Sequence, residues 1–458
     1  MRVASIIDDA PVTAFHRRLA LFSAGGPFLD GFALAVVGLA FITMQPSLAL
    51  TPTEVGVIGS AALAGIFVGG AVFGYVTDRV GRRVMYLVDL VVLVVASLAS
   101  ALVTDAWQLV ALRFLLGVAI GADYPIASSL LVEFLPRRQR GRYLGALFVV
   151  WAAGAAAAAL VGWALSPLGE SAWRLMLASP AVFGVLTVML RTGTPESPRW
   201  LLSKGRGAEA AAVLRQVYGH EVTVDQTSDG ASRTSYRKVF RRPYLRRTIF
   251  VSVFFSAHVI PLFAVYTFGP DILLSFGLPP GSGIYVAEAV IGGLFLLGGA
   301  PGLLLVDRIG RKSLLLWTFV VMAVLFGLMA AFQGASPALL LVLLCAYAVV
   351  SGSCNFIEII YPNELFPTDI RATATGIVTA ASRLGSAIST FMLPVMLTDL
   401  GAGATMLFLA VVNAVGFLVT VTLGVETKGR PLDETSSERV DSSAVSPVPR
   451  GEPVADEL

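Results

Sequence analysis

A series of twelve apolar runs, each about 20 residues long, constrains this chain more than any other feature of its sequence. A helix of about 20 apolar residues crosses the hydrocarbon core of a bilayer. Hydrophobic residues make up 56% of the chain and charged residues only 14%, and most of the charges lie between the runs. The sequence therefore predicts an all-α membrane protein. The predicted spans are 19–44, 54–76, 84–104, 107–131, 143–166, 172–191, 247–274, 282–306, 313–332, 337–361, 372–396 and 402–424.

The placement of Lys and Arg predicts the orientation of these spans. Of the 33 Lys and Arg residues, all but Arg113, Arg174 and Arg383 lie at the termini or in alternate loops that share one side with the termini. Loops rich in Lys and Arg stay in the cytoplasm. We therefore expect a multi-pass protein of the cell (plasma) membrane with an even number of spans and both termini cytoplasmic.

Three charged motifs of the first half recur in the second half. The sequence DRVGRR at 78–83 recurs as DRIGRK at 307–312, and EFLPRRQRG at 133–141 recurs as ELFPTDIRA at 364–372. Glu196, in PESPRW, is matched by Glu426, in VETKGR. The offsets are close to half the chain length, so the chain is predicted to contain two six-helix halves in parallel repeat. The predicted segments are a cytoplasmic N-terminus at 1–18, the halves at 19–191 and 247–424, a cytoplasmic middle loop at 192–246 and a largely disordered cytoplasmic tail at 425–458.

These motifs also carry a family resemblance. GYVTDRVGRR at 74–83 is similar to the signature that major facilitator superfamily transporters carry between spans two and three. PESPRWL at 195–201 and ETKGR at 426–430 resemble motifs of the sugar-porter and metabolite–proton symporter branch. The resemblance implies the major facilitator fold and transport of a small polar metabolite, sugar-like or an organic acid, by alternating access and proton symport.

The resemblance implies a role for the repeated charges as well. In the family such groups clasp the two halves together on the cytoplasmic side when the cavity opens outward. The alternative is that they only fix the topology and solvate the loops. The residues of this predicted cytoplasmic latch are Asp78, Arg82, Glu133, Arg140, Asp307, Arg311, Glu364 and Arg371.

Ionisable residues inside a span are costly and therefore mark candidate functional positions. In related symporters an acid in span one and an arginine in span four form a proton-coupling pair, and Asp30 and Arg113 match those positions. An arginine holds a nearby carboxylate ionised, and separation of the two favours protonation of the acid. The alternative is a permanent structural ion pair.

Five further residues are candidates for the substrate cavity. A polar stripe inside a membrane faces the bundle interior, and each candidate also has a structural alternative, such as packing or a hydrogen bond to a neighbouring helix. Arg383 has two possible roles, pairing with Glu358 or binding an anionic substrate group. Span seven lacks the paired Gln and the Asn that sugar porters carry, which argues against a plain hexose. The cavity candidates are Tyr124, His258, Asn355, Glu358 and Arg383, whereas Asp89 and Glu288 are assigned to packing seams between helices.

The sequence favours a transporter over other classes of protein. Proton-antiport export of a drug or secondary metabolite requires the same fold, and a solute receptor that moves nothing is an alternative of another class. No nucleotide-binding loop, metal motif or nucleophile–base arrangement points to an enzyme, so we expect neither a cofactor nor a bound metal. The net charge of +3 does not support nucleic acid as a partner. The expected partners are a small-molecule substrate, protons and the lipid bilayer, and we expect a monomer.

Overall fold

The computed structural model describes residue 7 and residues 10–136, 139–219, 236–242, 244–367 and 370–429, and their regular structure is helical. The first half of the chain contains α2 Ala14–Leu48, α3 Pro52–Val80, α4 Arg82–Ser100, α5 Ala106–Phe134, α6 Arg140–Leu165, the 3₁₀ helix η1 Ser166–Ser171, α7 Ala172–Ala178 and α8 Pro180–Arg191. Three short helices follow: α9 Pro198–Ser203, α10 Gly207–Tyr218 and α11 Tyr236–Val239. The second half contains α12 Tyr244–Ser275, α13 Ser282–Ile309, α14 Arg311–Ala331, α15 Pro337–Cys354, α16 Ile357–Leu365, α17 Arg371–Asp399 and α18 Gly401–Leu423.

Within the described residues, eleven stretches are long and apolar enough to cross a membrane. One of them, Gly145–Arg191, is 47 residues long and includes a turn at Gly169, whose φ of 67° requires glycine. This stretch crosses twice, as α6 and as the pair α7 and α8, so the predicted twelve spans are present. The helical hydrogen bonding of the tenth span is interrupted at residues 355 and 356, which keep helical dihedral angles, and its continuation α16 runs to Leu365, four residues beyond the predicted end.

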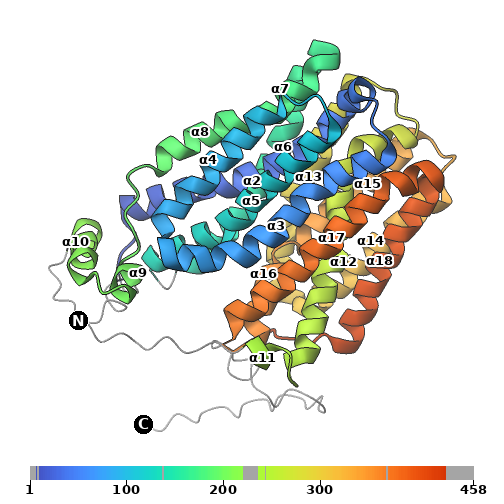
Figure 1. Ribbon diagram of the computed structural model, residues 1–458. Helices are drawn as coiled ribbons and strands as arrows, with labels where there is room; N and C mark the ends of the chain where they lie inside the picture. Colours follow the sequence, from blue (N-terminus) through green and yellow to red (C-terminus); the bar gives the residue numbers. More distant parts are fainter. Residues whose placement is uncertain are drawn as a thin grey trace, which may run out of the picture.

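Among the described residues, the most extensive contacts between the two halves are made by α2 with α12, α3 with α17, and α6 with α13 (Figure 1). Glycines of the first half lie against the backbone of the second half, nearer the end of the bundle where α2 meets α3, which is here called the outer end. At Gly38 an added Cβ would lie 2.5 Å from the carbonyl oxygen of Thr267, and at Gly56 it would lie 2.3 Å from that of Phe391. Small residues at such crossings let helix backbones approach closely in a membrane. The opposite end, here called the arginine-rich end, carries α9, α10 and α11.

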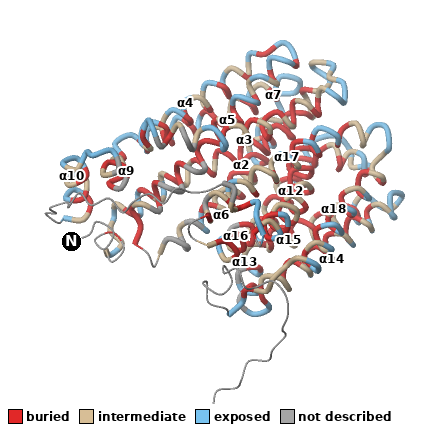
Figure 2. The backbone as a smooth tube through the Cα atoms, turned by 60° about the horizontal axis from the view of Figure 1, so that its bottom comes forward, coloured by how far each residue is buried: buried red, intermediate tan, exposed pale blue. Residues whose placement is uncertain are grey.

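The outer faces of the bundle are apolar. Large exposed hydrophobic side chains lie along α4, α8, α14 and α18, including Val95, Met189, Trp317 and Leu418 (Figure 2). Polar residues such as Asp30 and His258 are buried instead. This reversal of the usual soluble pattern is what a protein with lipid as its outer solvent requires.

The internal repeat has the same geometry in both halves at the arginine-rich end. Glu196 accepts hydrogen bonds from the backbone N–H groups of Arg82 and Arg83 at the start of α4, at 3.2 and 3.0 Å. Glu426 does the same for the N–H groups of Arg311 and of residue 312 at the start of α14, at 2.9 and 3.1 Å. A carboxylate at a helix N-terminus satisfies free N–H groups and interacts favourably with the helix dipole.

The contact of each capping glutamate requires glycine directly before α4 and directly before α14. Gly81 has a φ of 115° and Gly310 a φ of 96°. A Cβ added at Gly81 would lie 2.8 Å from Glu196 Oε2, and one added at Gly310 would lie 2.4 Å from Glu426 Oε2. The glycine of the repeated motif therefore provides both the backbone conformation and the space for the capping carboxylate.

We expect Gly81→Ala to destabilise the protein by about 1–3 kcal/mol, because alanine pays for the unfavourable backbone conformation and displaces Glu196. Thermal unfolding of the detergent-purified protein measures the loss. Gly327→Ala is the matched control, since a Cβ there meets nothing within 4 Å. Equal melting temperatures for the two variants would contradict the requirement for glycine.

Candidate functional site

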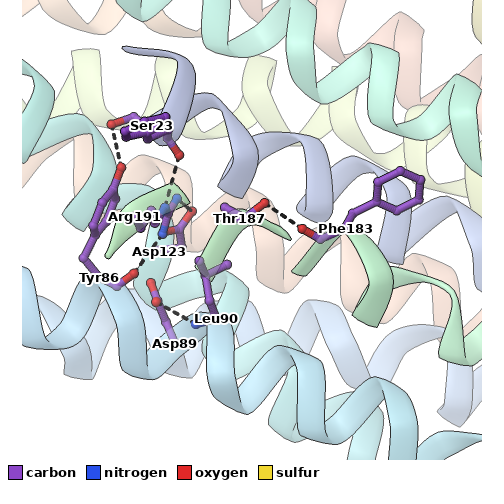
Figure 3. Close-up of polar contacts among 9 residues, drawn as sticks. Ser23, Tyr86, Asp89, Leu90, Asp123, Phe183, Thr187 and Arg191 are labelled. Atoms are coloured by element: carbon purple, nitrogen blue, oxygen red, sulfur yellow. Dashed lines mark hydrogen bonds and ion pairs between the residues drawn. The ribbon is translucent and has the colours of Figure 1, made fainter. Parts of the chain in front are cut away.

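A fully buried ion pair joins α8 to α5 in the N-terminal half (Figure 3). Arg191, the last residue of α8, donates from Nη1 to Asp123 Oδ1 at 2.6 Å and from Nη2 to Asp123 Oδ2 at 3.3 Å. The same guanidinium donates to the carbonyl oxygens of Phe22 and Tyr86, and it stacks 3.7 Å from the centroid of the Tyr86 ring. Arg191 therefore holds α2, α4, α5 and α8 together.

Sequence reasoning missed this pair for a simple reason. Arg191 ends an apolar run and begins the arginine-rich loop, so it was counted among the loop charges. The available signal was Asp123 itself, because a carboxylate within a span requires a cation as a partner.

Asp30 and Arg113, the predicted coupling pair, are both buried, yet no ion pair joins them in the described part of the chain. Arg113 Nη1 donates instead to the carbonyl oxygen of Ala33 at 2.8 Å, about one turn beyond Asp30 on α2. The two residues lie on contacting helices, α2 and α5. Their role in proton coupling stays a prediction.

Asp30 lies near charges of both halves. Its Oδ1 is buried and accepts no hydrogen bond from the described residues. Its electrostatic partners are Asp123 and Arg191 in the N-terminal half and Arg383, on α17, in the C-terminal half. The carboxyl is thus a buried ionisable group at the boundary between two units.

In the C-terminal half, His258 is held at both ring nitrogens. Nδ1 lies 2.5 Å from Glu358 Oε1, and Nε2 lies 3.1 Å from the carbonyl oxygen and 3.0 Å from the hydroxyl of Ser351. A carbonyl oxygen only accepts, so the geometry favours a proton on Nε2. One proton then lies between Nδ1 and the carboxyl, and the His258–Glu358 pair is neutral overall whichever atom holds it.

The other cavity candidates have different surroundings. Arg383 lies over the ring of Phe263, 5.2 Å from its centroid. Across the boundary, Trp151 on α6 makes edge contacts with Phe263 and Tyr266 of α12. Asn355 is half-buried at the break between α15 and α16. Aromatic side chains of both halves therefore meet beside the Arg383 cation.

Four of the eight predicted latch residues form two ion pairs, each of which lies inside one half. Arg82 Nη2 lies 2.9 Å from Glu133 Oε1, and Arg311 Nη2 lies 3.0 Å from Glu364 Oε1. Glu364 Oε2 also accepts from the Thr427 hydroxyl at 2.5 Å. These pairs brace α4 against α5 and α14 against α16, and the role of the charges in joining the halves stays a prediction.

The remaining latch residues complete this description. Arg371 Nε donates to the carbonyl oxygen of Phe366 at 3.1 Å, so it caps the end of α16 in the same half. Four predicted residues have side chains that lie outside the described part of the structure: Asp78, Arg140 and Asp307 of the latch, and Tyr124 of the cavity.

One further repeat was not predicted. His16 Nε2 lies 3.0 Å from the carbonyl oxygen of Phe134 at the end of α5, and Arg247 Nη1 donates at 2.8 Å to that of Leu365 at the end of α16. Both pairs link the first helix of a half to the end of its fourth span. The sequence did not indicate this repeat, because the equivalent positions of the two halves carry different residue types, histidine and arginine.

Comparisons with known proteins agree with this architecture. The profile of the family described as "Sugar (and other) transporter" matches residues 20–438. The putative metabolite transport protein YaaU of Escherichia coli (strain K12) is 38% identical over 95% of this chain and 98% of its own. The inner membrane metabolite transport protein YgcS of the same organism is 39% identical over 93% of this chain and 95% of its own.

A solved structure shares the fold. The partially occluded, inward-open xylose transporter XylE from E. coli superposes with a TM-score of 0.78 at 21% identity, over 92% of this chain and 100% of that one. The predicted major facilitator fold is confirmed.

Replacement of Glu358 tests the buried pair. We expect Glu358→Ala to destabilise the protein by about 3–5 kcal/mol, because His258 Nδ1 loses its partner in a site without water. Glu358→Gln keeps an amide next to the ring, and we expect it to lose markedly less stability than Glu358→Ala. Thermal unfolding in detergent measures both, and similar losses for the two variants would show that the hydrogen bond is not what stabilises the site.

Proposed function

Because this chain belongs to the sugar (and other) transporter family of the major facilitator superfamily, we propose that it moves a small polar metabolite by alternating access with proton symport. Its family membership makes it a multi-pass membrane transporter rather than an enzyme. The proposal concerns the coupling ion, the class of substrate and the orientation.

The position of Asp30 carries the proposal of proton coupling. Its carboxyl is buried, no described residue donates a hydrogen bond to its Oδ1, and its electrostatic partners lie in both halves. Alternating access moves one half relative to the other. The distance between Asp30 and Arg383 therefore changes during the cycle, and with it the stability of the ionised carboxylate. A group whose proton affinity follows the conformation couples proton binding to transport.

The substrate class follows from the boundary between the halves. Arg383, Phe263 and Trp151 place a guanidinium beside aromatic rings from both halves. A guanidinium recognises carboxylates through charge-assisted hydrogen bonds, and aromatic rings stack on flat or apolar ligand faces. We therefore favour a small organic acid over a neutral sugar.

The orientation follows from the arginine-rich end. The described basic residues at this end include Arg82, Arg246, Arg308 and Arg311. By the positive-inside rule, we place this end in the cytoplasm. Several close contacts between the halves lie toward the outer end, so the described conformation is closed at the face that we place outside.

Proton-driven accumulation in proteoliposomes tests the coupling. With the correct solute, wild-type protein should acidify the lumen as solute enters. Asp30→Asn should reduce proton-driven accumulation at least tenfold, because an amide binds no proton, while counterflow exchange continues. Glu170→Gln, at an exposed position in η1, is the matched control. Unchanged accumulation by Asp30→Asn would exclude Asp30 from coupling, and solute uptake without proton movement would exclude symport.

Inhibition by a panel of solutes tests the substrate class. We expect small organic acids to compete for transport in wild-type protein and to lose at least tenfold in apparent affinity in Arg383→Gln, because the carboxylate loses its cation. Neutral sugars should be affected little by this change. Equal losses for acids and sugars would show that Arg383 supports the fold rather than the substrate.

A further inference from the structure

The charges around Arg191 do not balance. Its guanidinium makes a bidentate pair with Asp123, which neutralises one carboxylate. A second carboxyl, Asp89 of α4, interacts electrostatically with both Asp123 and Arg191. Figure 3 shows the Asp89 carboxyl directed toward the Asp123–Arg191 pair. Two carboxyl groups therefore share a single arginine.

The hydrogen bonds of Asp89 point to the same imbalance. Its Oδ1 accepts from the backbone N–H of Leu90 at 2.7 Å. Its Oδ2 is buried and has no donor among the described residues. Asp123 lies close enough to interact electrostatically with Asp89, and two like charges in one buried site favour a proton on one of the two carboxyls.

The cluster is closed to water. Relative exposure is 4% for Asp89, 2% for Asp123 and 1% for Arg191. Among the described residues, Asp30 of α2 and Tyr86 of α4 also interact with these side chains. Neither of them carries a positive charge, and an isolated carboxylate in such a site is strongly disfavoured. A proton on one of the two carboxyls removes that unpaired charge.

We propose that Asp89 and Asp123 share one proton, and that this pair is a second proton site of the transport cycle in addition to Asp30. The second part rests on the proposed proton symport. In this proposal the proton is bonded to Asp89 while the Asp123 carboxylate stays paired with Arg191. Transfer breaks the O–H bond on Asp89 and forms one on Asp123, which leaves Asp89 as the carboxylate that Arg191 neutralises.

Helix α2 connects this pair to the boundary between the halves. Gly26 faces the pair so closely that an added Cβ would lie 1.7 Å from Asp123 Oδ2 and 2.6 Å from Arg191 Nη2. Asp30 follows one turn later on the same helix face, and Asp123 is among its electrostatic partners. A shift of α2 therefore acts on Asp30 and on the Asp89–Asp123 pair together.

Infrared spectroscopy of the purified full-length protein tests the shared proton without any substrate. At neutral pH a protonated carboxyl gives a C=O stretching band that carboxylates lack. We expect Asp89→Asn to remove one such band from the wild-type spectrum, and Glu170→Gln to leave the spectrum unchanged. If the band is unchanged in Asp89→Asn, the proposal that Asp89 and Asp123 share a proton is overturned.

Thermal stability supplies a second measurement of the same point. Asn replaces a neutral carboxyl at little cost, so Asp89→Asn should unfold close to the wild-type temperature. Asp123→Asn removes the carboxylate that accepts from both Nη1 and Nη2 of Arg191, and it should unfold at a clearly lower temperature because these charge-assisted hydrogen bonds are lost. The opposite order would place the charge on Asp89 and overturn the assignment.

Transport separates a coupled proton from a structural one. In proteoliposomes Asp89→Asn should reduce proton-driven accumulation at least tenfold and retain counterflow. If Asp89→Asn loses the infrared band but accumulates solute as the wild type does, the proton is structural. The claim that the pair is a second proton site of the transport cycle is then overturned. If wild-type protein itself moves no protons, symport fails, whereas the infrared result still decides whether the proton is shared.

Discussion

A buried charge must find its counter-charge inside the protein, because the bilayer offers no water, and the rest of this structure depends on that constraint. Arg191 shows its effect most clearly. Its guanidinium bonds to Asp123 and to two backbone carbonyl oxygens, and it stacks on Tyr86. These contacts come from three helices, α2, α4 and α5, so a single buried cation on α8 ties four helices together. Apolar side chains alone do not fix the position of one helix against the next, because lipid is as apolar as they are.

The two halves have equivalent contacts at the arginine-rich end but different polar contacts inside the membrane. At the arginine-rich end the capping glutamates, Glu196 and Glu426, make equivalent hydrogen bonds in both halves. Inside the membrane, the N-terminal half has the Asp123–Arg191 pair and the C-terminal half has His258 with Glu358. The repeated ends preserve the fold, and the different interiors provide distinct chemistry on the two sides of the boundary.

The sequence predicted the spans and the repeat of the loop charges well, because these depend on composition and spacing along the chain. Arg82 with Glu133 and Arg311 with Glu364 are pairs within the predicted set. Partners inside the membrane were harder to predict, since they depend on helix rotation and depth. Arg113 reaches the Ala33 carbonyl oxygen instead of Asp30.

The interruption of the tenth span was not predicted either. The predicted span 337–361 runs through Asn355 and Phe356, where α15 ends and α16 begins, although both residues keep right-handed helical dihedral angles. Ser351 of α15 and Glu358 of α16 both contact the ring of His258. The two helices on either side of the interruption therefore hold the buried pair of the C-terminal half.

The distribution of charge pairs explains how such a protein can move its halves at low cost. Separating two opposite charges in a medium without water is expensive. The pairs Asp123–Arg191 and His258–Glu358 each lie within one half, so rocking the halves leaves both intact. Asp30 and Arg383 instead attract each other across the boundary. In the proposed cycle the energy of that interaction changes as the halves part, and we therefore propose that a proton on Asp30 or an anionic substrate at Arg383 replaces the lost partner.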